Sequence, residues 1–363
     1  LQALAQGCPE IRVVDAPAEL PAVQRWQPPA AAPALRPAQP YAAEFDRRWG
    51  IGSFSSLTRA MAAPSLPVLP VAAQSPAEDE RALQAQEAGE AALDLGAIND
   101  VMTALPTLGR FAAGARSDAA VWHRFMRGPV VGNFLHDQLE WLAAEGFALQ
   151  PEDDPDSSEP LAARLLRRCE RAGRKEQAAD VLQWLRAVVH QPLAPLGVSL
   201  AQLGQGDALL PEMEFWLPAR RLSAPRIDAL CRRHILPGQP RPVLPERELH
   251  GMLMGFADLV FEHQGKFWVL DYKSNALGED DAAYHPAALD RALLAHRYDV
   301  QATLYLLALH RLLKQRLGAA YQPEQQLGGA LYLFLRGIHA PGNGCCHLAP
   351  PLALLEQLDC LSG

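Results

Sequence analysis

The sequence predicts an α/β fold: a central mixed sheet flanked by helices, with a further helical portion towards the N-terminus. Short apolar runs rich in β-branched and aromatic residues predict the strands, at 213–217, 255–261, 267–272 and 327–335. Segments with the apolar spacing of helices surround these runs, at 117–147, 161–173, 175–190 and 286–317. Together these patterns indicate a globular domain that contains both kinds of element.

The composition fits a globular protein but not one that coats nucleic acid. Apolar residues make up 49% of the 363 residues, while 31 prolines indicate long irregular connections. The net charge of −8 argues against binding of nucleic acid by bulk charge, although an acidic protein can still carry a local cationic track. Basic residues cluster at 164–175, where a solvated helix face is the simpler interpretation.

The six cysteines are scattered and form no CxxC pair, which argues against a zinc or iron–sulfur site. This usage is typical of a reducing environment, so we expect a cytoplasmic protein. The sequence contains no signal peptide and no apolar run of membrane-spanning length, and we expect no membrane partner.

The first forty residues differ in composition from the rest. Residues 11–14 could form a strand, and residues 27–40 are rich in proline and alanine, which favours an extended spacer over a packed segment. A domain boundary is therefore expected near Tyr41. We expect residues 1–40 to be a remnant of a preceding domain with its tether, and residues 41–363 to form one domain. Because the chain begins at Leu1, we interpret it as a piece of a longer polypeptide.

Capping and breaking residues delimit the elements of the N-terminal half. Ser55 or Ser56 could cap a helix that starts near Leu57, and the Pro/Ala-rich, then acidic, residues 62–90 predict a surface loop. Ser117 and Asp118 are candidate caps of the helical region at 117–147, which Gly128-Pro129 should divide into two helices.

In the C-terminal half, a polar loop at 277–284 precedes Pro286, which suits the first turn of a long helix to about residue 317. From Ala340 onwards we expect a loop and then a short apolar helix. No GxxxxGK[ST] motif occurs, so this chain lacks the usual means of cradling ATP.

The chemistry-bearing residues concentrate at 251–275. The apolar runs 255–261 and 267–272 flank a polar, glycine-containing tip, which predicts a β-hairpin. An acid inside an apolar strand is costly unless it is paired or binds a cation, and this hairpin contains Asp258 and Asp271. Antiparallel pairing would bring both acids to neighbouring strands, and the strand period of two turns Lys273 to the same side as Asp271. The trio predicts either a site for a hard divalent cation and a phosphate or a buried Asp–Lys ion pair.

Specific motifs resemble those of the PD-(D/E)XK nuclease superfamily. GFADLVF followed by WVLDYKSN is similar to the core of that family, and LGEDDAAYHPAALDRALLAHRYDVQATLYLLALHRLL and GGALYLFLRG continue the likeness. The resemblance is strong over residues 128–337 and implies a restriction-endonuclease-like fold. In the helicase-linked form of the family a tether joins the motor to the nuclease, and residues 27–40 would be its equivalent.

The resemblance also implies roles for residues outside the hairpin. In GNFLH the family's first motif has a histidine that binds metal, which implies that His136 is a ligand together with Asp258, Asp271 and the backbone carbonyl of Tyr272. The QxxxY motif corresponds to Gln301 and Tyr305, a pair that could hold a phosphate or orient the catalytic Lys273, although Tyr305 could equally be a core residue. Glu214 corresponds to an acid near the metal, or is an exposed strand acid that shares one side of its strand with Glu212.

The resemblance implies a nuclease that hydrolyses DNA phosphodiester bonds with Mg²⁺, for which Mn²⁺ could substitute because a nitrogen ligand is softer than Mg²⁺ prefers. It implies single-stranded DNA as the preferred substrate and partner subunits of a helicase complex. Two other functions stay open: a non-catalytic docking module of the same fold, and an independent end-processing or restriction-type nuclease. The filled motif positions argue against the first, and the tether argues against the second.

Overall fold

The computed structural model describes residue 14 and residues 49–58, 61, 119–151, 160–206 and 208–361. Apart from Val14, these residues belong to one compact unit, Asp46–Gly363. The strand predicted at 11–14, the loop at 62–90 and the caps Ser117 and Asp118 fall wholly or almost wholly outside the described residues. The domain boundary near Tyr41 stays a prediction.

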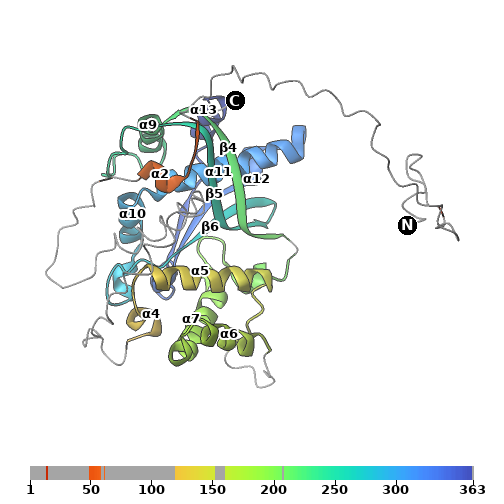
Figure 1. The fold of residues 1–363 in the computed structure, drawn as a ribbon, viewed down its shortest axis with the longest axis vertical. Coiled ribbons are helices and arrows are strands. Elements are labelled where there is room, and N and C mark those ends of the chain that lie inside the picture. Colours follow the sequence, from red (N-terminus) through yellow and green to blue (C-terminus); the bar gives the residue numbers. More distant parts are fainter. Residues whose placement is uncertain are drawn as a thin grey trace, which may run out of the picture. The chain divides into compact units, whose positions relative to one another are not determined.

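A six-stranded mixed sheet forms the centre of the unit (Figure 1). Its strands are β1 (Gly50–Gly52), β4 (Leu209–Ser223), β5 (Glu248–His263), β6 (Lys266–Lys273), β7 (Leu327–Phe334) and β8 (Cys345–Leu348). Hydrogen-bonded neighbours follow the order β1-β5-β6-β7-β8. In addition to this path, β4 pairs with β5. The β1–β5 and β6–β7 pairs are parallel and the other pairs are antiparallel, so the predicted mixed sheet is confirmed. A separate short pair joins β2 (Pro192–Leu193) to β3 (Val198–Ser199).

The helices of the described residues include long elements and single turns. The α-helices are α2 (Phe54–Thr58), α4 (Val121–Arg124), α5 (Pro129–Ala144), α6 (Pro160–Arg171), α7 (Ala178–His190), α8 (Leu200–Leu203), α9 (Ala224–His234), α10 (Pro286–Ala295), α11 (Tyr298–Leu317), α12 (Pro323–Gln326) and α13 (Leu352–Leu361). The 3₁₀ turns are η2 (Lys175–Gln177), η3 (Asp281–Tyr284), η4 (Gly318–Ala320) and η5 (Leu335–Gly337). None of these helices is long and apolar enough to cross a membrane. The described cysteines are all free thiols.

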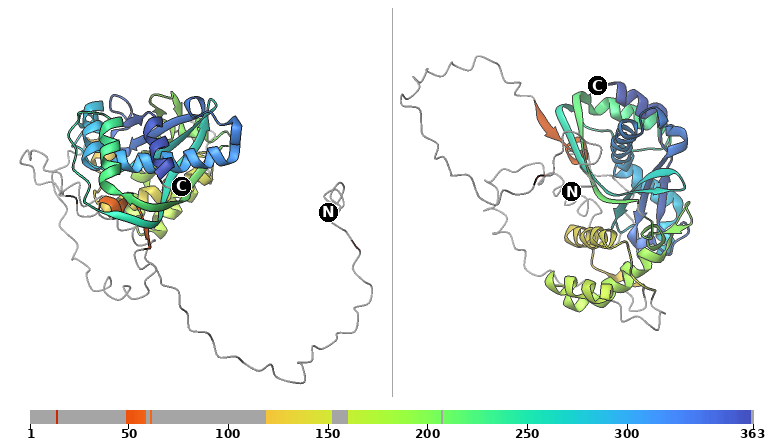
Figure 2. Two further views of the ribbon diagram at one scale, coloured as in Figure 1. Left: turned by 90° about the horizontal axis from the view of Figure 1, so that it is seen from above. Right: turned by 90° about the vertical axis from the view of Figure 1, so that its right-hand side faces the viewer.

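Two hydrophobic cores cover the two faces of the sheet. Along β6, Val269 belongs to one core, whereas Leu270 and Tyr272 belong to the other, as the strand period of two requires. Helices α4 to α8 form the second core with one face, and α2, α9, α10, α11 and α13 form the first core with the other. Figure 2 shows these two sets of helices on opposite sides of the sheet. A side chain at the end of β6 can therefore meet either helical layer.

The central hairpin is confirmed, with a tighter turn than predicted. β5 and β6 pair up to His263↔Lys266, so the turn consists of Gln264 and Gly265 alone. Both turn residues have positive φ, 53° and 76°, which is the backbone of a type I′ turn. Such a turn matches the twist of the strands, and it extends the ladder into the polar tip of the sequence.

Three local predictions are wrong at their boundaries. The helix expected over 286–317 is two helices, because Arg297 adopts φ 59° between α10 and α11. The loop expected from Ala340 contains β8, which pairs with β7. The helix expected to start near Leu57 begins at Phe54, where Ser53 and Ser56 exchange side-chain to backbone hydrogen bonds.

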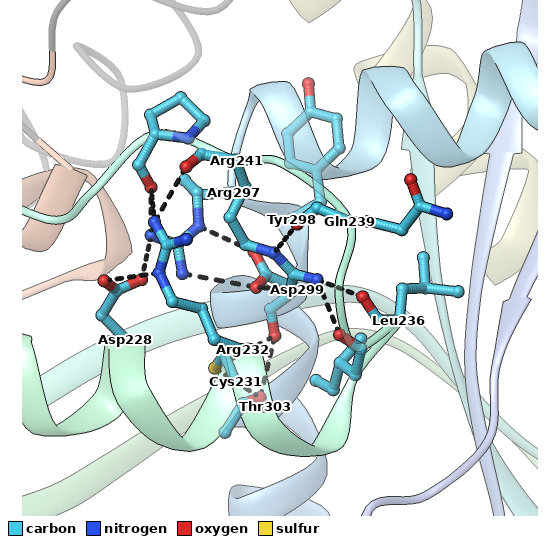
Figure 3. A network of polar contacts seen from close by, with 12 residues as sticks. Asp228, Cys231, Arg232, Leu236, Gln239, Arg241, Arg297, Tyr298, Asp299 and Thr303 are labelled. Atoms are coloured by element: carbon cyan, nitrogen blue, oxygen red, sulfur yellow. Dashed lines mark hydrogen bonds and ion pairs between the residues drawn. The ribbon is translucent and has the colours of Figure 1, made fainter.

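The start of α11 is held by a buried network of charges (Figure 3). Asp299 accepts hydrogen bonds from Arg241 Nη1 (2.8 Å) and Arg297 Nε (3.0 Å), and Arg297 Nη1 lies 2.6 Å from Asp228 Oδ1. The side chains of Arg241, Arg297 and Asp299 are fully buried. Burial alone would lower the pKa of Arg297, but the two acids raise it above its ordinary value. The network thus compensates the left-handed backbone at Arg297, which is unfavourable for a side chain with a Cβ.

Helix α5 lies against the end of β6 at a glycine. A Cβ on Gly132 would be 2.8 Å from Ser274 Oγ, one residue beyond β6. Only a residue without a side chain allows the helix to approach this closely without displacing Ser274. Because His136 follows one turn later on α5, this approach also sets how near His136 comes to the sheet.

Asp299→Asn should destabilise the protein by about 3 kcal/mol or more, because it leaves buried guanidinium groups without their shared carboxylate. Urea unfolding followed by circular dichroism measures the loss. The matched control is Asp180→Asn, which removes the exposed Arg124–Asp180 pair and should cost at most about 1 kcal/mol. Similar losses in the two variants would contradict the importance of the network.

The Gly132–Ser274 contact predicts that the effect of Gly132→Ala on stability depends on which residue occupies position 274. Gly132→Ala should destabilise the protein by about 1 kcal/mol or more because it overpacks against Ser274. In a Ser274→Ala background the same change should stabilise it by roughly 0.5–1 kcal/mol, the ordinary gain of alanine over glycine within a helix. Urea unfolding of the four proteins tests this, and stabilisation in both backgrounds would show that the contact does not constrain α5.

Candidate active site

The two hairpin acids lie where β5 and β6 separate. The last residue pair of their ladder is Leu259↔Leu270, and the next residues on the two strands are Asp258 and Asp271. At this point the Tyr272 N–H donates to Asp258 Oδ2 (2.8 Å) rather than to a backbone carbonyl. The carboxylate thus takes the place of a ladder acceptor, and both acids sit side by side on neighbouring strands, as the sequence predicts.

His136 reaches this point from the second core. Its Nδ1 is 3.3 Å from Asp258 Oδ2, and its ring meets the Tyr272 ring edge-on, with centroids 5.9 Å apart. The helix α5 that carries His136 is far from the hairpin in sequence, so this contact depends on tertiary packing. The structure therefore brings together His136 and Asp258, which only the family resemblance relates in the sequence.

Lys273 approaches from the opposite face of the sheet. Its Nζ is 2.8 Å from Asp271 Oδ2, and both side chains are only 5% exposed. The same Nζ lies 4.0 Å from the ring centroid of Tyr298 and 5.7 Å from that of Tyr332. The buried Asp–Lys pair that the sequence leaves open is thus present, directly beside the His136–Asp258 contact.

Charge within the site is unevenly compensated. Burial raises the pKa of Asp271 to about 7, because Lys273 offsets only part of the lost hydration and Asp258 opposes ionisation further. Burial also acts to raise the pKa of Asp258, but His136 and the Tyr272 amide lower it below its usual value. For His136, burial acts to lower the pKa, and Asp258 raises it above the ordinary value. The second carboxylate accordingly lacks a full counter-charge.

The residues fit a divalent cation by their chemistry. Among the described residues, no group of three or more His, Cys, Asp and Glu side chains lies close enough to share an ion, because Asp271 is turned to Lys273 and Asp258 to His136. Yet His136 Nε2 is buried without a hydrogen-bond partner, and burial keeps the pKa of Asp271 above its ordinary value despite the ion pair with Lys273. Carboxylate oxygens, a backbone carbonyl and one imidazole form a donor set that Mg²⁺ or Mn²⁺ accepts.

The QxxxY pair lies on α11 behind the lysine. Gln301 Nε2 donates to Tyr305 Oη (2.9 Å), and Tyr332 Oη lies 3.4 Å from Gln301 Oε1. Gln301 and Tyr305 are both 3% exposed, so they are buried within the first core. Their contact with Lys273 runs through Tyr332, which suits the orienting role better than direct contact with a phosphate. Their function stays a prediction.

Glu214 lies on the exposed side of β4, where it accepts a hydrogen bond from Trp216 Nε1 (2.8 Å). Its partner across the ladder is Phe256, not an acid of the site. Glu212 and Asp258 instead lie opposite each other on β4 and β5, between the residue pairs Pro211↔Leu259 and Met213↔Ala257. Of the two glutamates that the sequence places on this strand, Glu212 is thus the one that lies level with the site.

Arg336 was not singled out in the sequence, yet it connects the elements of the site. It is 1% exposed and donates to four backbone carbonyls, those of Ser274, Trp122, Phe125 and Met126, at 2.6–3.2 Å. These bonds tie the chain beyond β6 to the connection that leads into α5. The only local signal is an arginine that directly follows an apolar strand, which does not identify its partners.

Comparison with known proteins agrees with this geometry. The profile of the PD-(D/E)XK nuclease superfamily matches residues 112–349. The RecBCD enzyme subunit RecB of Escherichia coli K12 is 40% identical over 242 residues, which cover 65% of this chain and 19% of that protein. RecB of Haemophilus influenzae is 38% identical over 181 residues, covering 48% and 14%, and RecB of Mycolicibacterium smegmatis is 28% identical over 340 residues, covering 87% and 28%.

The chain thus spans between about a seventh and about a quarter of the length of these curated relatives. The match extends over α4 and α5 with His136, over the hairpin, and over α11 and β7. The fold, the placement of the hairpin acids and the matched profile lead to one conclusion: the chain belongs to the PD-(D/E)XK nuclease superfamily.

Proposed function

We propose that this domain hydrolyses DNA phosphodiester bonds with the help of a divalent cation, Mg²⁺ or in its place Mn²⁺. His136, Asp258, Asp271 and the backbone carbonyl of Tyr272 would hold the ion. The observation that carries the proposal is the meeting of two carboxylates from adjacent strands, Asp271 buried and Asp258 half-buried, with an imidazole from one helical layer and an ammonium on the other face. A structural ion pair alone would explain Asp271 and Lys273 but not His136 and Asp258.

Each group has a distinct task in the hydrolysis. A bound Mg²⁺ supplies an acidified water and polarises a phosphate oxygen. Asp258 and Asp271 provide the negative charge that attracts a cation into a buried position. Lys273 donates hydrogen bonds to the attacking water or to the negative charge that develops on the phosphate, which is worth most in a site shielded from water. Gln301 and Tyr305 fix the surroundings of Lys273 from α11.

The substrate and partners are proposed from the relatives, which are RecB subunits of the RecBCD enzyme. The domain would act on single-stranded DNA without sequence preference, because the site addresses phosphate rather than base edges. In a longer chain it would work in the cytoplasm beside RecC- and RecD-type subunits, with residues 27–40 as a tether to a helicase motor. Its roles would be double-strand break repair and the degradation of linear DNA.

A non-catalytic docking module is the second candidate. The closed Asp271–Lys273 ion pair favours it, since such a pair stabilises a fold in the absence of any ion. The buried His136 Nε2 without a hydrogen bond favours the nuclease, because this nitrogen lies beside the site carboxylates, where it can serve as a ligand of a cation. An independent nuclease is favoured by no described feature.

Asp271→Ala should lower Mg²⁺-dependent cleavage by at least about a hundredfold, because it removes a ligand and with it the cation that activates water. A labelled single strand incubated with excess protein measures the rate, and circular dichroism verifies that the fold survives. Glu214→Ala, on the exposed side of β4, serves as the control and should cleave at the rate of the parent protein. Full cleavage by well-folded Asp271→Ala would remove this residue from the site.

Removal of the metal separates the nuclease from the docking module. EDTA should stop degradation of the labelled strand, and excess Mg²⁺ or Mn²⁺ should restore it, because the carboxylates alone cannot activate water at neutral pH. Calorimetry with each ion gives an independent measure of binding. If folded protein neither binds the ions nor degrades DNA with them, the docking module is the better description.

A further inference from the structure

The surroundings of Lys273 contain an aromatic element to which the proposed hydrolysis assigns no role. The Lys273 Nζ lies 4.0 Å from the centroid of the Tyr298 ring and 5.7 Å from that of the Tyr332 ring, and the two rings stack on each other at 5.4 Å with an interplanar angle of 16°. Both tyrosines are 1% exposed. The ammonium therefore has a carboxylate on one side and aromatic faces on another.

Aromatic faces suit a lysine that must stay close to a cation site. A ring attracts an ammonium through its quadrupole, and the attraction grows when water is excluded. Unlike a second carboxylate, a ring offers no oxygen that would bind the metal. It also accepts no conventional hydrogen bond, so it does not compete with Asp271 for the N–H groups of Lys273.

Tyr298 is itself fixed at both ends. Its hydroxyl donates to Asn275 Oδ1 (3.2 Å), two residues beyond Lys273, and its carbonyl accepts a hydrogen bond from Tyr332 (2.7 Å). The ring of His296 stacks against it with centroids 5.4 Å apart. The ring thus cannot turn away from Lys273 without breaking buried contacts.

The network in Figure 3 fixes the backbone that precedes this ring. Arg297 has φ 59° and forms the N-cap of α11, so Tyr298 is the first residue of that helix. The bonds from Arg297 to Asp299 and Asp228 hold this conformation. They determine the direction in which α11 starts and therefore where the Tyr298 ring lies.

We propose that Tyr298 is a positioning residue for Lys273: its ring holds the ammonium beside Asp271, and the Arg297–Asp299–Asp228 network holds the ring. The proposal deepens the proposed function, because it concerns how that same site places its lysine. It assigns no contact between Tyr298 and DNA or metal.

A kinetic cycle tests the proposal. Tyr298→Leu should lower kcat for Mg²⁺-dependent degradation of a labelled single strand roughly tenfold with KM nearly unchanged, the loss that follows from a desolvated cation–π contact. Tyr298→Phe keeps the ring and should restore most of kcat. In a Lys273→Met background Tyr298→Leu should cause no further loss. Tyr321→Leu, which alters a tyrosine paired with His310 away from the site, is the matched control.

Equal losses from Tyr298→Leu with and without Lys273 would overturn the proposal, as would a loss in Tyr298→Phe as large as in Tyr298→Leu. Either result would show that the residue acts on the fold or through its hydroxyl rather than on the ammonium.

A second measurement needs no activity. In protein labelled with ¹³C at lysine Cε, the Lys273 signal, identified by its loss in Lys273→Met, should be shifted upfield by the ring current of Tyr298. The shift should persist in Tyr298→Phe and become much smaller in Tyr298→Leu, where only the more distant Tyr332 ring remains near Lys273. If the chain cleaves no DNA but the shift behaves in this way, the proposed function fails while the positioning stands. An unshifted Lys273 signal in the parent protein overturns the positioning itself.

Discussion

Two carboxylates that lie side by side, one buried and one half-buried, are the constraint on which the remaining structure depends. Asp258 and Asp271 lie where β5 and β6 separate, and each loses hydration while repelling the other. The compensation comes from both faces of the sheet: His136 on α5 approaches Asp258, and Lys273 pairs with Asp271. Neither helical layer alone can complete the site. The fold must therefore hold both layers in fixed positions relative to the hairpin acids.

Different devices place the two layers. On the α5 side, Gly132 allows the helix to approach Ser274, and Arg336 ties the connection before α5 to the end of β6 through backbone carbonyls. On the α11 side, buried ion pairs around Arg297 set the start of the helix. The first device is steric and the second is electrostatic. Both act on the position of the backbone that carries the site.

The sequence predicts those features that arise from neighbouring residues. The hairpin, the division of the helical region before Pro129 and the shared side of Asp271 and Lys273 all follow from turn chemistry and period. The break at Arg297 could not be predicted, because the ion pairs that stabilise its backbone include Asp228 and Arg241, which are distant in the sequence. Likewise, the spacing of residues around His136 does not predict that it lies near the hairpin acids, because that proximity depends on packing between the helical layer and the sheet. Only the family resemblance indicated it.

The division of the site between two cores has a genetic consequence. Substitutions inside either core reduce the amount of folded protein and with it every property of the chain. Substitutions at the seam, at positions such as Gly132 and Arg336, leave both cores filled but shift one half of the site against the other. Alleles that separate protein abundance from enzymatic competence should therefore map to this seam, far more often than to the sheet interior.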